Sequence, residues 1–216
     1  MLLAMYAGVT PQNATGFPAR VWGTSRPVGA GSAQSWITID GSGVAASGIG
    51  VSFDEGALQD LGPRVTETVI PLPAAPDLPF RDVVIDWVPN GRPEGHLYDA
   101  PHFEVYFYML DEATRLAMGS ANAAAGAALP ADILPQPELR GGAFSATPVY
   151  GFWDGHLACV EAMVTLDYLR SKPTRISLLP QPPRFEQHGL YPTEWSVSYE
   201  PDTHRYSVAF SRLALR

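Results

Sequence analysis

Turn-forming residues are spread along the whole chain and limit how long any helix or strand can be. The 216 residues include 21 prolines and 20 glycines, distributed throughout rather than gathered in one tract. Proline interrupts helix interiors and central strands, and glycine favours turns. The sequence therefore predicts many short elements joined by turns. No apolar run approaches the roughly 18 residues of a membrane-spanning helix, and we expect none.

Most runs between these turns are rich in β-branched and aromatic residues or alternate polar with apolar, which is typical of strands. The expected strands cover residues 19–22, 34–40, 48–53, 65–72, 83–88, 102–110, 144–153, 174–179, 193–199 and 205–213. Short helices are expected at 55–61 and 112–118, each preceded by an aspartate that can cap it. For 157–169 a strand followed by a helix is one interpretation, and periodicity leaves it open.

These elements predict an α+β, predominantly β chain. We expect residues 1–216 to form a single antiparallel-rich domain, barrel-like or a sandwich, with two or three short helices. Residues 1–18 are expected to be an extended N-terminal segment. Residues 119–143, rich in Ala, Pro and Gly, are expected to form a long surface loop.

The charge and composition of the chain restrict the classes of partner that it can bind. The net charge is −8, the isoelectric point is near 5.0, and no Lys/Arg cluster is present. This balance argues against nucleic acid or anionic membrane as a partner. Hydrophobic content of 46% with 17% charged residues predicts an extensive interface, hence a homo-oligomer. We expect a soluble protein, cytoplasmic as written or extracytoplasmic if a signal peptide has been removed.

The stretch 95–108 concentrates chemically active side chains. It holds two of the five histidines, a carboxylate and three tyrosines. Because side chains alternate in a strand, His102, Glu104, Tyr106 and Tyr108 are predicted on one face and Phe103, Val105 and Phe107 on the other. The polar face is the best candidate site in the chain.

A metal site is one interpretation of this stretch. His96 and His102 with Glu104 supply two nitrogens and one oxygen, a donor set suited to zinc or non-haem iron. The alternative is a pair of structural histidines bonded to backbone groups at the strand entrance. Neither a Cys-x-x-Cys nor a His-Glu-x-x-His pattern occurs, and no nucleotide-binding fingerprint is present.

Two further residues extend the candidate site. Glu161 lies inside an apolar run, where a carboxylate needs a cation or metal partner, or has a raised pKa and serves as acid or base. The alternative is an edge position facing water. Tyr106 is a phenolic donor that can orient a substrate carbonyl, although strand tyrosines more often bury the ring and leave the hydroxyl in water.

The long motif resembles a bacterial domain family of unknown function, many of whose members are exported. The family's hallmark is Gly-His-x-Pro followed by Pro-His-Phe-Asp-Phe-His-Phe-Tyr; here the run is Gly95-His96, then Pro101 to Tyr108. The resemblance covers about residues 20–213 and implies a metal site at His96, His102, Glu104 and Glu161. Two features depart from it: Tyr106 replaces the second strand histidine, and 119–143 lacks a Gly-x-His-Trp element.

Two functional hypotheses follow. The first is a small-molecule enzyme of the hydrolase, isomerase/cyclase or lyase type. Its catalytic residues would be His102, Glu104, Tyr106 and Glu161, with or without one divalent metal and with no nucleotide cofactor. The second is a non-catalytic protein that binds a metal or an apolar ligand within a homo-oligomer. A purely structural role in an assembly is the third reading.

Overall fold

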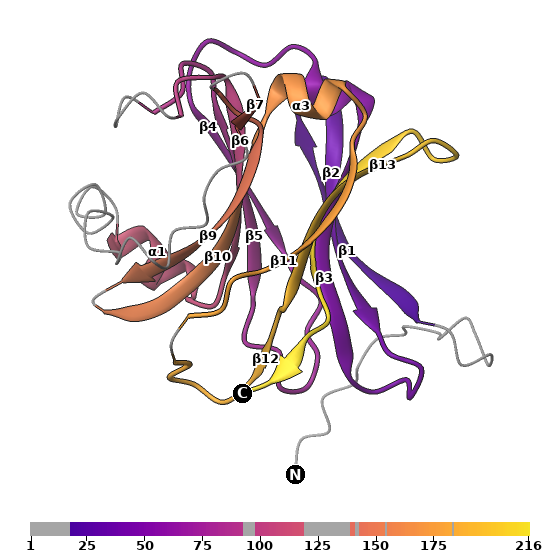
Figure 1. Cartoon of the computed structure of the whole chain (residues 1–216), viewed down its shortest axis with the longest axis vertical. Helices are drawn as coiled ribbons and strands as arrows, with labels where there is room; N and C mark the ends of the chain where they lie inside the picture. Colours follow the sequence, from indigo (N-terminus) through magenta and orange to yellow (C-terminus); the bar gives the residue numbers. More distant parts are fainter. Residues whose placement is uncertain (1–17, 93–97, 119–138, 141–142, 154, 183) are drawn as a thin grey trace.

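The computed structural model describes residues 18–92, 98–118, 139–140, 143–153, 155–182 and 184–216. Two antiparallel sheets face each other across a hydrophobic core (Figure 1). The larger sheet has the order β1 (Ala19–Val28), β2 (Gly31–Ile39), β3 (Ala46–Asp54), β14 (Arg205–Ser211), β13 (Glu194–Glu200) and β11 (Thr174–Leu178). The smaller sheet has the order β4 (Thr66–Pro71), β5 (Asp82–Val88), β6 (His102–Tyr108), β10 (His156–Thr165) and β9 (Ala146–Trp153).

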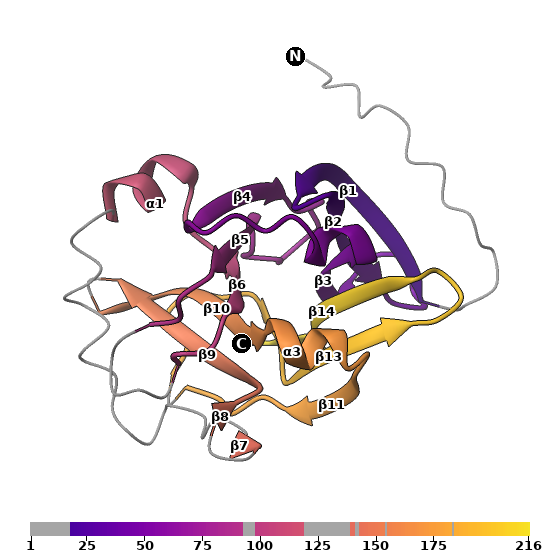
Figure 2. The same ribbon diagram turned by 90° about the horizontal axis from the view of Figure 1, so that it is seen from above.

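Short elements complete the fold. Two-residue strands pair as β12 (Leu190–Tyr191) with β15 (Ala214–Leu215) and as β7 (Leu139–Arg140) with β8 (Ala143–Phe144). The helices are the 3-10 turn η1 (Glu55–Leu58), α1 (Glu112–Met118) and α3 (Leu166–Arg170). In the view from above, α3 lies between the sheets at one end of the sandwich (Figure 2).

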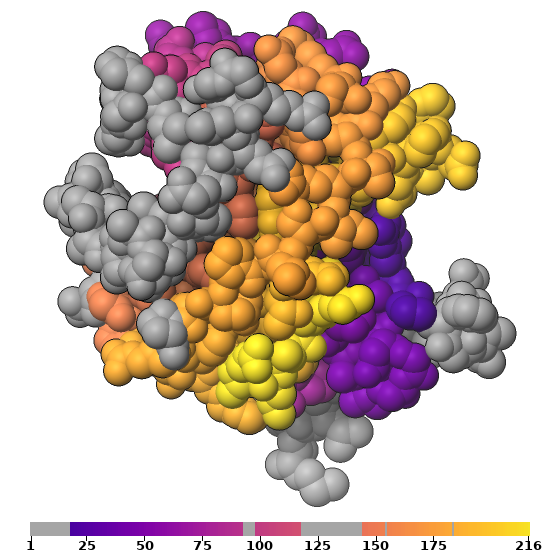
Figure 3. All heavy atoms as spheres, in the orientation of Figure 1, coloured from indigo at the N-terminus to yellow at the C-terminus, as the bar shows by residue number. Residues whose placement is uncertain are grey.

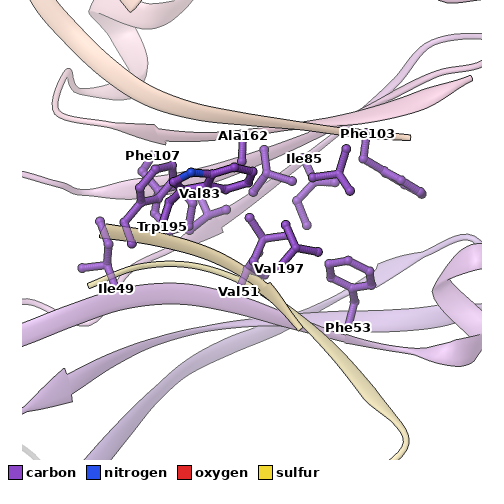
Figure 4. Close-up of a cluster of buried hydrophobic side chains, with 14 of the residues drawn as sticks. Ile49, Val51, Phe53, Val83, Ile85, Phe103, Phe107, Ala162, Trp195 and Val197 are labelled. Carbon is purple, nitrogen blue, oxygen red and sulfur yellow. The ribbon is translucent and has the colours of Figure 1, made fainter. Parts of the chain in front are cut away.

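The inward faces of both sheets form one core. Phe103, Phe107 and Ala162 from the smaller sheet meet Ile49 and Val197 from the larger one (Figure 4). The rings of Phe107 and Phe210 lie edge to face with centroids 5.2 Å apart. Since alternate residues of each strand face this core, the alternation read from the sequence determines which side of each strand lies between the sheets.

The predicted fold class is confirmed: the chain is predominantly β, with short helices and antiparallel sheets. Of the two predicted architectures the sandwich is found, since the sheets of the described part do not close into a barrel. The run 157–169 is a strand followed by a helix, with the change at Thr165, which caps α3 by accepting from the Tyr168 amide at 3.2 Å.

Some predictions lie outside the described residues or stay untested. The segment 1–17 and most of the predicted loop 119–143 lie outside them, and a single domain over 1–216 stays a prediction. Among the described residues no helix has the length and apolar character needed to cross a membrane.

Candidate functional site

The candidate site lies on the outer face of the smaller sheet. Phe103, Val105 and Phe107 of β6 belong to the core between the sheets, as predicted from alternation. The intervening side chains of β6 therefore point away from the core. In register, Glu104 faces Asp86 of β5 and Met163 of β10, and Tyr106 faces Glu161 of β10. The fold thus brings together four predicted residues: His102, Glu104, Tyr106 and Glu161.

This outer face is buried, which alternation alone does not predict. His102 and Glu104 are 0% and 2% exposed. Val84, Tyr108 and Cys159 form a second, smaller apolar cluster on this face, and Tyr106 packs against it. The rings of Tyr106 and Tyr108 stack with centroids 5.4 Å apart. The polar groups are therefore held in a low-dielectric layer, where each needs a specific partner.

Glu104 is the centre of a hydrogen-bond network. The Arg92 guanidinium donates to both of its oxygens, from Nε to Oε1 at 2.8 Å and from Nη2 to Oε2 at 2.5 Å. The Tyr106 hydroxyl donates to Oε2 at 2.7 Å. Burial by itself would raise the pKa of Glu104, but these bonds and that from His102 outweigh it and hold the pKa below its usual value. Glu104 is thus the ionised member of the site.

His102 is fixed at both ring nitrogens. Its Nδ1 lies 2.6 Å from the carbonyl oxygen of Ala100, and its Nε2 lies 3.2 Å from Oε1 of Glu104. A carbonyl only accepts, so Nδ1 carries a hydrogen. The backbone bond is the one expected of a structural histidine at the strand entrance. The carboxylate on the other side makes the same ring part of the polar network.

Glu161 has the opposite electrostatic environment. It is 8% exposed, so the alternative of an edge position facing water is wrong. Burial, and then the negative charge of Glu104, raise the pKa of Glu161 well above its usual value. Tyr106 lies opposite Glu161 on β10 and donates to Glu104. Because the single phenolic hydrogen goes to ionised Glu104, the phenol oxygen is left as an acceptor for a protonated Glu161.

Sequence reasoning missed Asp86. It follows Ile85 in a strand whose pattern reads as apolar, and it faces both Glu67 and Glu104 across neighbouring strands. Burial and the charge of Glu104 raise its pKa to about 7. Its Oδ1 is buried and has no hydrogen-bond partner among the described residues. A carboxylate inside a predicted buried strand was the signal available in the sequence.

Sequence reasoning also missed Arg92. It stands in the loop before β6, where its backbone forms an isolated bridge to Tyr98. Its side chain is 40% exposed while the Glu104 side chain is 2% exposed, so the guanidinium connects the buried network to the surface. The rule that a buried carboxylate needs a cation predicts such a partner but not which arginine supplies it.

The metal site that the resemblance implies stays a prediction, and two of its donors already have partners in the described part of the chain. No group of three His, Cys, Asp or Glu side chains that could hold an ion is found in the described ranges. Both oxygens of Glu104 already accept from Arg92, and His102 faces Glu104 and Ala100. A guanidinium beside the carboxylate also opposes a second cation. His96, the remaining predicted ligand, lies outside the described residues.

A hollow lies close to this network without including it. It has a volume of about 410 Å³ and is lined by Ala100, Pro101, Phe144, Ser145, Thr165, Leu166, Asp167, Tyr168, Arg170 and Ser171. His102 contacts two of these lining residues, Ala100 and Phe144, the latter edge to face with ring centroids 5.2 Å apart. One layer of side chains therefore separates the hollow from the imidazole.

Comparison with known proteins adds nothing to this geometry, since no family model, curated protein or solved structure matches the chain.

Proposed function

We propose that the chain is an enzyme that performs general acid–base chemistry on a small molecule at the Glu161–Tyr106–Glu104 network. The observation that carries the proposal is a pair of carboxyl groups beside one phenol, which bonds to Glu104 and lies opposite Glu161, and the pKa values of the two carboxyl groups are shifted in opposite directions. Such divergence assigns the acid and the charged partner in enzymes that run proton transfer near neutral pH. The reaction classes consistent with it are hydrolysis, isomerisation or cyclisation, and elimination.

Each residue has a role in this proposal. Protonated Glu161 donates its proton to the substrate and takes a proton back from water at the end of the turnover, and the Tyr106 oxygen orients the Glu161 carboxyl group. Ionised Glu104 fixes the phenol hydrogen, and Arg92 and His102 hold Glu104 in place. Arg92 is the exposed member, so we place substrate entry on its side. The resemblance to the bacterial domain family concerns this same strand and stays a proposal.

The test is turnover by conservative variants. We would incubate the protein with panels of small esters, lactones and ketones in D2O and follow product and deuterium incorporation by NMR. Glu161→Gln and Tyr106→Phe are expected to lower any activity found by at least about 100-fold, the usual contribution of a positioned acid. The control is Glu67→Gln. Glu67 lies on the same sheet, is 46% exposed and forms an ion pair with Arg115 of α1. Activity unchanged in both site variants would refute the proposal.

A second candidate, a non-catalytic binding protein, is favoured by one observation. Both oxygens of Glu104 accept from Arg92, and Oε2 also accepts from Tyr106, so Glu104 has a structural role without any substrate. On this reading Glu161→Gln and Tyr106→Phe keep ligand affinity, measured calorimetrically with ligands that co-purify, and no turnover occurs in any panel.

A further inference from the structure

In β11, the last strand of the larger sheet, polar side chains point inward and apolar side chains point outward. Its inward residues are Arg175 and Ser177, which pair with Val197 and Trp195 of β13. Its outward residues are Ile176 and Leu178, which are 68% and 76% exposed. An edge strand normally turns apolar side chains inward and blunts its outer side with charge. Here Ile176 lies opposite Ser196 of β13, and Leu178 lies opposite Glu194.

The inward charge of β11 does not project from the edge. The Arg175 guanidinium lies 5.7 Å from the ring centroid of Trp195, and its Nε donates to Ser177 Oγ at 2.8 Å. Arg175 is thus held on the inward side of β11, beside Trp195. It covers apolar surface there and leaves the outer side of the strand without a charged side chain.

In the described part of the chain, every second residue of β11 has backbone N–H and C=O groups that no strand pairs with. The Leu179 amide donates to the Thr193 carbonyl and the Tyr199 amide to the Pro173 carbonyl, each at 2.8 Å. In an antiparallel pair the hydrogen-bonded positions alternate, so Arg175 and Ser177 make the bonds to β13. The N–H and C=O groups of the other residues, Thr174, Ile176 and Leu178, therefore point away from the sheet. β11 ends the strand order of this sheet and lies at the edge of the molecule in Figure 2.

From this edge we propose that two copies of the chain pair through β11, antiparallel and about a two-fold axis at Ile176, into a continuous sheet. In that register Ile176 faces its own copy, and Thr174 faces the partner copy's residue 178. All outward backbone groups of the strand are then satisfied. Each Arg175 faces a serine rather than the other arginine, so no like charges oppose each other. The apolar side chains meet on the outer face.

The flanking residues limit this pairing to one partner. Pro180 follows Leu179 at a position whose backbone would point outward, and it cannot donate to an extended ladder. The self-complementary strand is used up in one contact, so the assembly closes as a dimer rather than growing into a fibre. The surface around β11 is visible at the front of the molecule in Figure 3, where this segment is orange. The proposal is independent of the acid–base site.

The test introduces charges of either sign at Ile176, on the two-fold axis, and measures dimer formation by sedimentation velocity. A single strand pair is a small interface, so we expect a dimer with a dissociation constant of about 10–100 µM. Ile176→Lys and Ile176→Glu each place like charges opposite each other and should sediment as monomers up to about 500 µM. An equimolar mixture of the two variants should form the dimer again, since lysine then faces glutamate.

Controls separate this result from misfolding. Val65→Lys introduces the same charge at another exposed apolar residue, 59% exposed, and should leave the dimer intact. Circular dichroism should be the same for all variants. A wild-type chain that stays monomeric at about 500 µM would overturn the proposal. So would a dimer insensitive to Ile176→Lys, or a mixture of variants that does not reassociate.

Discussion

At the scale of single residues, the outer face of the smaller sheet is a chain of partnered polar groups rather than an open pocket. Arg92 and Tyr106 donate to Glu104, His102 lies against it, and Glu161 lies opposite the same phenol on β10. Each group determines the protonation of its neighbour, because few waters are available to compensate in a buried layer. The residues that define the chemistry are therefore also residues that stabilise the fold.

Removing the Arg92 guanidinium should destabilise the protein, because Glu104 is then buried without its cationic partner. Arg92→Gln is expected to lower the free energy of unfolding by about 2–4 kcal/mol, because Glu104 stays buried without its bidentate partner. The double variant Arg92→Gln/Glu104→Gln should recover most of that loss. Urea unfolding measures both. Arg184→Gln removes an exposed ion pair with Glu186 and should cost less than about 0.5 kcal/mol. Equal effects of the two single variants would contradict this account.

Asp86 should make stability depend on pH. Its pKa is about 7 in the folded protein and ordinary, near 3.8, in the unfolded chain. Between these values the folded state holds a proton that the unfolded state has lost, so this contribution to stability falls as pH rises from about 4 to 7. Asp86→Asn keeps the shape without the charge. The variant should equal the wild type at pH 5 and exceed it at pH 8 by about 1–3 kcal/mol.

Thermal unfolding at pH 5, 6, 7 and 8 measures this difference. The groups around Asp86 that also titrate or carry charge are Glu67, Glu104, Arg92 and Arg115, and they are present in both proteins. A wild type and a variant with parallel stability profiles over this range would show that Asp86 titrates normally.

At the scale of elements, close approaches fix how the strands of the larger sheet pack. The ring of Trp36 on β2 lies flat over Gly50 of β3, and its Nε1 donates to Ser52 Oγ at 3.1 Å. A Cβ added at Gly50 would lie 2.2 Å from a carbon of that ring. The glycine is required by the tryptophan above it, not by its backbone conformation.

Gly50→Ala should therefore destabilise the protein by about 1–3 kcal/mol, the usual cost of overpacking, because the indole must move from its site. Gly62→Ala is the matched control, since a Cβ there meets no atom within 4 Å. Chemical unfolding followed by tryptophan fluorescence reports both the stability and the displaced ring. If Gly50→Ala and Gly62→Ala unfold alike, Trp36 does not hold the position described.

Local elements were the part of the fold most accessible from sequence. Asp54 accepts from the Ala57 amide at 3.1 Å and begins η1, and Asp111 accepts from the Thr114 amide at 2.7 Å before α1, so both predicted caps are confirmed. The alternation of β6 assigned each side chain to the correct face. Those signals depend on neighbours in sequence, which is why one chain suffices to read them.

At the scale of the whole molecule, the sequence could not predict what depends on distant strands. Sheet order places Glu161 beside Tyr106 and Asp86 beside Glu104, and no local pattern encodes that order. The burial of the polar face and the choice of Arg92 as cation follow from it. The residue types of the candidate site were therefore predictable from the sequence, while their partners and protonation required the tertiary structure.

The protonation of Glu161 tests the account most directly. We would record infrared difference spectra of the carboxyl region at pH 7 and 8.5 for the wild type, Glu161→Gln and Asp86→Asn. We expect a protonated carboxylic acid band at pH 7 that is retained in Asp86→Asn, where Glu161 alone supplies it, and is weaker in Glu161→Gln, where only Asp86 contributes. If the wild type shows no such band at pH 7, Glu161 is ionised and cannot donate to Tyr106, which contradicts the proposed network.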